Sequence, residues 1–266
     1  MLPIFYINMA SRTDRRDHVE RQLTALGLTA SRIEAVTPSD FELPPGSPLS
    51  SGELGCSRSH QKIWRLMVEQ NIAAALILED DVLLADEIPA LLADPGLLVG
   101  GVEAIQLETR GYTRALVGPA VATGVPGVSR NRLMSSSLGS AAYIMTRELA
   151  QRLLARPDVD RLALDHLLFG WAGELCYDAR IFQTLPALAI QLDQTVDGRR
   201  GAGKSDLDDN RLTGALPHKS LAIRWRRLKI QFRHYMRVLV TFGSSGELWG
   251  ARKLQFPIAE NLRKLM

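Results

Sequence analysis

The feature that most constrains the fold is an apolar run that ends in three consecutive carboxylates. Residues 73–78 read AAALIL, and Glu79, Asp80 and Asp81 follow without a break. A continuous apolar run of this length is typical of a central strand in a parallel sheet, because helices cover both faces of such a strand. Ligands of open α/β sheets bind beyond the carboxyl ends of the strands. The run therefore predicts a buried strand whose acidic end lies at a ligand site.

The first two-thirds of the chain alternates between short apolar segments and stretches of helical periodicity. The expected strands are residues 2–8, 32–36, 73–78, 102–107 and 138–145. The expected helices, where apolar residues recur every three to four positions, are residues 11–26, 57–70 and 147–155. This alternation predicts an α/β domain built on a mostly parallel sheet, and we place that domain at residues 1–215.

The acidic tripeptide indicates a metal site. Adjacent carboxylates repel one another, and a divalent cation with a preference for oxygen ligands, Mn²⁺ or Mg²⁺, relieves that repulsion. In extended backbone, Glu79 and Asp81 point to the same face and are the expected ligands, whereas Asp80 points to the other face. A cation at this place suits the departure of a diphosphate. Two other interpretations are a solvated turn after the strand and the carboxylate pair of a nuclease or phosphatase.

Cysteine content and hydropathy bear on location. The chain has two cysteines, Cys56 and Cys176, which cannot form a disulfide framework and favour a reducing compartment. The apolar segment at the N-terminus is too short for a signal peptide, and its charges follow it rather than precede it. No uninterrupted apolar stretch reaches the roughly 18 residues that a membrane span needs. We therefore expect a cytoplasmic protein.

Four sequence blocks, in this order and at this spacing, carry a family resemblance. They are INMASRTDRR at residues 7–16, GELGCSRSH at 52–60, LILEDDV at 76–82 and GSAAYIMT at 139–146, with weaker matches at 164–168 and 186–191. Together they resemble glycosyltransferase family 25, which includes lipopolysaccharide-biosynthesis galactosyltransferases and is related to collagen galactosyltransferases. The resemblance covers roughly residues 2–210.

The resemblance implies a nucleotide-diphospho-sugar transferase fold of the GT-A type, with a Rossmann-like mixed sheet. It also implies an inverting transfer of a hexose, commonly galactose, from a UDP-sugar to a hydroxyl of a lipopolysaccharide-type or other cell-surface glycan. The implied cofactor is Mn²⁺ or Mg²⁺. The expected partners are thus a nucleotide sugar and a glycan or glycolipid acceptor.

Individual residues acquire expected roles from these blocks. Asn8 and Arg12 fall where the nucleotide base would lie, and Arg15 opens a helix whose N-terminus suits a phosphate. The remaining residues expected at the donor site are His60, Asp80 and Gln191. Each has a structural alternative: a solvated charge at a helix start, a hydrogen-bonding histidine, or the end of a strand.

An inverting transfer needs a base that takes the proton from the acceptor hydroxyl. Asp165 is our candidate, because LDHLLF resembles a family block in which an acidic residue precedes an apolar run. Family members often have proline before this aspartate, whereas this chain has Leu164. A third metal ligand or a helix cap are the alternatives for Asp165, and weaker candidates for the base are Glu103, Glu108 and Asp160.

The segment 198–205, GRRGAGKS, matches the phosphate-loop pattern letter for letter. No strand feeds directly into the loop, and the residues that follow lack apolar helical periodicity, so we interpret the match as chance. A phosphate-loop nucleotide hydrolase centred on Lys204 is nevertheless the second functional hypothesis. The third is an inactive, transferase-like module that binds a membrane or a protein partner.

The C-terminal segment, residues 216–266, is predicted to be a basic amphipathic helical extension. From His218 onward it has eleven lysines and arginines and two glutamates, so it carries +9 while the rest of the chain carries −6, within a total of +3. Its apolar residues follow helical spacing and are Leu221, Trp225, Leu228, Phe232, Tyr235, Met236 and Leu239. Such a helix suits an anionic membrane surface, here the inner face of the cytoplasmic membrane. Packing on the core is the alternative, and no nucleic-acid motif accompanies the charge.

Overall fold

The computed structural model describes residues 1–111, 114–196, 221–243 and 246–266, with no description of the side chains of residues 221–231. The main sheet has nine strands in the order β11-β6-β7-β9-β5-β8-β3-β1-β2. Their bounds are β1 (Ile4–Asn8), β2 (Ser31–Glu34), β3 (Ala74–Glu79), β5 (Ala104–Gln106), β6 (Arg114–Ala122), β7 (Ser129–Leu133), β8 (Ala142–Thr146), β9 (Ile181–Leu185) and β11 (Arg252–Gln255). A small second sheet joins β4 (Val82–Leu84) to β10 (Ala189–Gln191).

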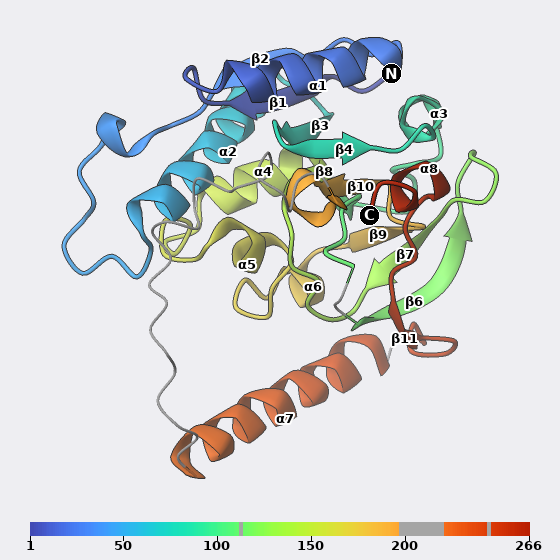
Figure 1. Ribbon diagram of the computed structural model, residues 1–266. Coiled ribbons are helices and arrows are strands. Elements are labelled where there is room, and N and C mark those ends of the chain that lie inside the picture. The colour runs from blue at the N-terminus through green and yellow to red at the C-terminus, as the bar shows by residue number, and fades with distance from the viewer. Residues whose placement is uncertain (112–113, 197–220, 244–245) are drawn as a thin grey trace.

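Helices cover both faces of the main sheet (Figure 1). Their bounds are α1 (Thr13–Ala25), α2 (Ser51–Glu69), α3 (Ile88–Ala93), α4 (Arg147–Leu154), α5 (Leu164–Leu168), α6 (Leu175–Asp178), α7 (Leu221–Gly243) and α8 (Glu260–Arg263). Two short 3-10 helices span Pro38–Asp40 and Leu192–Gln194. Alternate residues of β3 face opposite layers: Leu76 and Leu78 pack with residues of α1, whereas Ile77 packs with residues of α2 and α4.

The sheet is parallel only in part. Strands β2, β1 and β3 run parallel, with Ile7 of β1 opposite Glu79 of β3. Strand β8 is antiparallel to both β3 and β5. The prediction of a mostly parallel sheet, made from the alternation of strands and helices, is therefore wrong beyond β3. The fold class, α/β with a mixed Rossmann-like sheet and a helical C-terminal extension, is confirmed.

Helix α2 begins six residues before the predicted position. Ser50 caps it through a capping box, in which the Ser50 hydroxyl accepts from the Glu53 backbone N–H and the Glu53 carboxylate accepts from the Ser50 backbone N–H. Six residues of extra helix bring Cys56 onto α2, one turn before His60. The early start therefore places both side chains on the same helical face.

The C-terminal extension returns to the sheet. Strand β11 pairs antiparallel with β6, and Leu262 of α8 is buried in the core. The division at residues 215 and 216 remains a prediction, because the residues around it lie outside the described part of the chain. Among the helices that the structure describes, none combines the length and the apolar character needed to cross a membrane.

Candidate active site

The acidic tripeptide lies at the carboxyl end of β3, beside the end of β1. It borders a cavity of about 290 Å³ between these strand ends and α2. Of the residues expected at the donor site, Asn8, Arg15, His60 and Asp80 line this cavity, and so do both expected metal ligands, Glu79 and Asp81. A cavity therefore lies at the strand end where the apolar run predicted a ligand site, and ligand binding there stays a prediction.

Asn8 links three strands at this edge. Its side-chain amide donates to Asp80 Oδ2 at 2.7 Å, and its Oδ1 accepts from the Arg32 Nε–H at 3.0 Å. Asn8 is 2% exposed, so its amide is committed to these partners. The bonds hold the ends of β1, β2 and β3 in a fixed relation at the cavity.

Arg15 neutralises two of the three carboxylates. Its Nη1 donates to Asp80 Oδ1 at 3.3 Å and to Asp81 Oδ2 at 3.0 Å. The expected alternation of faces is wrong at this point, because the strand ends at Glu79 and residues 80 and 81 form a turn that brings both aspartates to one guanidinium. Arg12, by contrast, pairs with the exposed carboxylate of Asp14.

The electrostatics of the aspartates favour a cation. Burial raises the pKa of Asp80, and burial together with the nearby charge of Glu79 raises the pKa of Asp81, against the opposing effect of Arg15. Asp81 Oδ1 is buried and has no hydrogen-bond partner among the described residues. Carboxylate oxygens are the ligands that Mn²⁺ and Mg²⁺ prefer, so this donor set fits a hard divalent cation.

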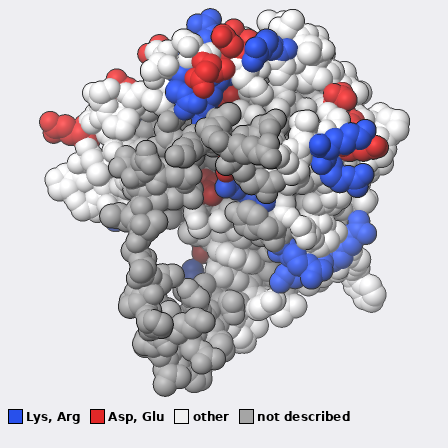
Figure 2. Space-filling view, viewed as in Figure 1, with Lys and Arg blue, Asp and Glu red and all other residues white. Residues whose placement is uncertain are grey.

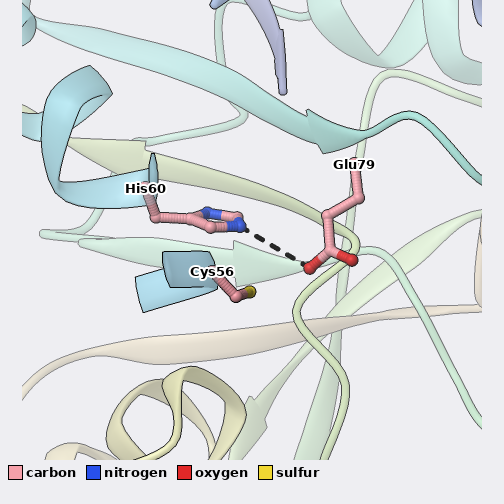
Figure 3. Close-up of side chains that lie close together, drawn as sticks. All are labelled: Cys56, His60 and Glu79. Carbon is pink, nitrogen blue, oxygen red and sulfur yellow. Dashed lines mark ion pairs between the residues drawn. The ribbon is translucent and has the colours of Figure 1, made fainter. Parts of the chain in front are cut away.

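Glu79 points toward His60 of α2 (Figure 3). Its Oε1 lies 3.5 Å from His60 Nε2 and accepts from the Ser140 hydroxyl at 3.4 Å. His60 Nδ1 lies 2.8 Å from the Tyr143 hydroxyl, which also accepts from the Trp64 indole N–H at 3.1 Å. The buried side chains of Tyr143 and Trp64 thus fix the orientation of the His60 ring, and His60 Nε2 points toward Glu79.

Glu108, one of the weaker candidates for the base, is fully buried next to this group. Its Oε2 accepts from the Ala141 backbone N–H at 2.6 Å. Burial and the charge of Glu79 raise the pKa of Glu108 to about 8. Glu108 does not line the cavity, but its carboxyl holds its proton near neutral pH because of its burial and the nearby charge of Glu79. Its charge is therefore coupled to that of the site.

Gln191 and Asp193 approach from the small sheet. The Leu192 backbone N–H donates to Asp81 O at 2.8 Å, and the charge of Asp193 contributes to the raised pKa of Asp81. Arg110 donates to Gln191 and, at 3.2 Å, to Asp193 Oδ2. Gln191, the last residue of β10, therefore accepts a hydrogen bond from the Arg110 side chain. Asp193 was not among the residues predicted from the sequence, because it belongs to no recognisable motif.

Asp165 lies in the first turn of α5 and is not among the residues that line the cavity. Its Oδ1 accepts from the His166 backbone N–H at 2.7 Å, and its charge contributes to raising the pKa of the Cys56 thiol. Asp160 and Glu103 are held by Arg58 and Arg152. The role of Asp165 stays a prediction, and the phosphate-loop match at 198–205 lies outside the described residues.

Comparisons with known proteins identify the kind of protein that this chain resembles. The model of glycosyltransferase family 25, described as a lipopolysaccharide biosynthesis protein, matches residues 1–97. Lacto-N-neotetraose biosynthesis glycosyltransferase LgtE of Neisseria meningitidis is 27% identical over 204 residues, which cover 70% of this chain and 72% of that protein. Procollagen galactosyltransferase 2 of Homo sapiens is 28% identical over 187 residues, which cover 62% of this chain and 29% of that protein.

A crystal structure of a glycosyltransferase involved in the glycosylation of the major capsid of PBCV-1 aligns with 75% of this chain and 96% of that chain, with a TM-score of 0.42 and 10% identity. The sequence matches define the class of this protein as a glycosyltransferase. Within that class, the resemblance to family 25 is confirmed.

Proposed function

We propose that this chain is an inverting glycosyltransferase that moves a hexose, galactose in our assignment, from a UDP-sugar to a hydroxyl of a lipopolysaccharide-type or other cell-surface glycan. The observation that carries the proposal is the cavity at the ends of β1 and β3, where Asn8, His60 and the acidic tripeptide converge. A diphosphate leaving group and a divalent cation both suit such a strand end. The reaction takes place at the cytoplasmic face of the membrane.

Glu79 and Asp81 hold the cation in this proposal. A bound Mn²⁺ or Mg²⁺ neutralises the negative charge that develops on the departing diphosphate. Asp81 binds the cation through its buried Oδ1, which makes no hydrogen bond with the described residues. The Arg15 guanidinium offsets the negative charge of Asp80 and Asp81 that the cation does not neutralise. Asp80, fixed by Asn8, supports the end of the strand and faces the donor sugar.

The acceptor side needs a base. As the acceptor oxygen bonds to the anomeric carbon and the bond to the diphosphate breaks, Asp165 takes the hydroxyl proton and later releases it to solvent. Its place in α5, close enough for its charge to act on Cys56 at the cavity wall, supports this assignment. The nucleotide lies toward Asn8 and Arg12 at the end of β1. Neither Arg12 nor Gln191 of β10 is among the residues that line the cavity, and in this proposal both contact the donor from outside its wall.

The experiment is Mn²⁺-dependent release of UDP from a panel of UDP-sugars with a lipooligosaccharide acceptor. Asp81→Asn should lower kcat at least 100-fold, whereas Asp17→Asn, an exposed aspartate of α1, should leave it unchanged. Equal rates in the two variants would overturn the metal assignment. ATP or GTP turnover that is lost in Lys204→Ala would instead favour the nucleotide hydrolase. Absence of thermal stabilisation by any UDP-, GDP- or CMP-sugar with Mn²⁺ would favour the binding module.

Helix α7 provides the membrane contact in this proposal. Phe232, Tyr235 and Leu239 are 64%, 65% and 55% exposed. Val238 and Phe242, which follow Tyr235 by three and seven positions and so flank the exposed residues on the helix surface, are buried against the body. The apolar stripe identified in the sequence therefore points away from the core in its described part. An exposed aromatic and apolar face on a basic segment suits the interface of an anionic bilayer, where a lipid-linked acceptor would lie.

A further inference from the structure

Three side chains of different chemistry converge on one wall of the cavity (Figure 3). Cys56 and His60 lie one turn apart on α2, and Glu79 ends β3 opposite them. One sulfur, one nitrogen and one oxygen from these residues all lie within 4.8 Å of one another. The three atoms are close enough to share one ion after small side-chain rotations.

His60 Nε2 is the atom that requires an explanation. The His60 side chain is 1% exposed, and its Nε2 makes no hydrogen bond with any described residue. It points at Glu79 Oε1 across 3.5 Å, which is longer than the roughly 2.7–3.2 Å of a normal hydrogen bond. Two ligands of a tetrahedral zinc ion, each about 2.0–2.2 Å from the metal, lie roughly 3.3–3.5 Å apart. The observed separation therefore matches two ligands of one ion better than a hydrogen-bonded pair.

The surroundings of His60 support coordination through Nε2. Tyr143 Oη lies 2.8 Å from His60 Nδ1. When the lone pair of Nε2 binds a metal, the ring proton is on Nδ1, and Tyr143 Oη accepts a hydrogen bond from this N–H. The ring is also stacked on Tyr143, with centroids 5.7 Å apart. Metal-binding histidines usually have their second nitrogen fixed in this way by a neighbouring polar group.

The donor set selects the kind of ion. Thiolate and imidazole ligands suit zinc and related transition metals, whereas Mn²⁺ and Mg²⁺ prefer oxygen ligands such as those of Glu79 and Asp81. We propose that Cys56, His60 and Glu79 bind a zinc-class divalent cation through three protein ligands, with the fourth position open to the cavity. Binding converts the Cys56 thiol to a thiolate, and the proton passes to solvent.

This site shares Glu79 with the Mn²⁺ or Mg²⁺ site of the proposed function. An ion held by Cys56 and His60 draws the Glu79 carboxylate toward α2 and away from Asp81. Zn²⁺ should therefore inhibit Mn²⁺-dependent sugar transfer, and Cys56→Ser should relieve the inhibition. This consequence rests on the proposed function, whereas the binding site itself does not.

The test of the binding site uses cobalt as a spectroscopic substitute for zinc, on the full-length protein and without any sugar donor. Co²⁺ should bind one ion per chain at this site and produce a thiolate-to-cobalt charge-transfer band, which Zn²⁺ abolishes. The band should be lost in Cys56→Ser and should require at least 10-fold more Co²⁺ in His60→Gln. Cys176→Ser is the matched control, because Cys176 is the second of the two cysteines and lies on α6. It should keep the band, as should Asp81→Asn.

A second measurement uses only the unaltered protein and so does not depend on whether the variants fold. Zn²⁺ should slow the alkylation of Cys56 by iodoacetamide at least 10-fold, as read by mass spectrometry of the two cysteine peptides. Absence of the band together with unprotected Cys56 would overturn the proposal, and so would a band that survives in Cys56→Ser. Either result leaves the UDP-sugar assay unaffected, so the two proposals fail separately.

Discussion

The side-chain amide of Asn8 donates a 2.7 Å hydrogen bond to the carboxylate of Asp80, and this bond joins the carboxyl ends of two parallel strands. Both residues are at least nine-tenths buried, at 2% and 7% exposure. The asparagine is in turn held by Arg32 from β2. The floor of the cavity is therefore a polar network, and the loss of one member leaves buried partners unsatisfied.

Asn8→Ala should lower the free energy of unfolding by about 1–3 kcal/mol, because Asp80 loses a charge-assisted hydrogen bond inside the protein. Urea denaturation measures the change. Arg12→Gln removes an exposed ion pair with Asp14 at the same end of β1 and should cost less than about 1 kcal/mol. Equal effects of the two substitutions would contradict a structural role for the Asn8–Asp80 bond.

Removal of Arg15 tests the charge balance of the aspartates. Arg15→Gln leaves Asp80 and Asp81 buried without their cation, which should destabilise the protein by about 3–5 kcal/mol. If the carboxylates bind Mn²⁺, saturating Mn²⁺ should restore more thermal stability to this variant than it adds to the unaltered protein. Thermal unfolding with and without Mn²⁺ gives both values. An equal Mn²⁺ increment in the two proteins would show that the ion does not replace the guanidinium.

The buried carboxyl of Glu108 should make stability depend on pH. Its pKa is raised from 4.5 to about 8 by burial and by Glu79, so between these pH values the folded protein holds a proton that the unfolded chain has released. Its contribution to stability is thus fully present below about pH 4.5 and is lost as the pH rises toward 8. Urea denaturation in the presence of a chelator should show Glu108→Gln losing less stability than the unaltered protein across this window, by up to a few kcal/mol. Parallel pH profiles would show that Glu108 does not titrate there.

Gly139 makes room for that same carboxyl. A Cβ at this position would lie 2.8 Å from the Glu108 side-chain carbon, and the backbone φ of +120° is one that other residues rarely adopt. Gly139→Ala should therefore cost more than about 2 kcal/mol, through strain and the displacement of Glu108. Gly27→Ala, at a φ of +67° with open space around it, should cost less, about 1 kcal/mol. Differential scanning calorimetry compares the two.

The sequence predicted the parts of the site that local patterns define. The apolar run of β3 and its acidic end were recognisable because a buried strand has a characteristic composition. Strand β7 was missed because its sequence, SRNRL, contains two arginines and an asparagine that are buried. These side chains donate to backbone carbonyls of other segments, as Arg132 does to Ile181 and Cys176. These hydrogen bonds offset the cost of burying polar side chains, but the acceptors are distant in the sequence. The local sequence of β7 therefore gives no indication of a buried strand.

The contacts within the site were beyond prediction for a similar reason. Extended backbone was assumed through Asp81, whereas the chain turns at residues 80 and 81 and presents both aspartates to Arg15. The turn is stabilised by the Leu192 backbone N–H, more than a hundred residues away in the sequence. The proximity of Cys56 to Glu79 likewise follows from the packing of α2 against β3.

Basic side chains gather beside acidic ones on the face shown in Figure 2. The described end of α7 also makes ion pairs with the body. Arg233 and Arg237 lie 3.0 and 2.5 Å from Glu174 Oε1, so part of the positive charge of the extension is used to dock the helix. If the helix also binds membranes, its apolar face must then supply a large share of the affinity.

The membrane proposal therefore predicts that a double substitution on that face, Phe232→Ser with Tyr235→Ser, will weaken sedimentation with phosphatidylglycerol vesicles by about 100-fold or more, since each apolar side chain contributes about 1.5–3 kcal/mol on burial and about 1.4 kcal/mol is a factor of ten in affinity. Thermal stability should be unchanged, because both side chains are already exposed in the folded protein. Val99→Ser, at a side chain 63% exposed in a loop of the main body, is the control and should bind as the unaltered protein does. Phosphatidylcholine vesicles should bind all three proteins weakly, because they lack the anionic charge that attracts the basic segment. Equal binding of the double variant and the control to anionic vesicles would show that this face of α7 does not enter the bilayer.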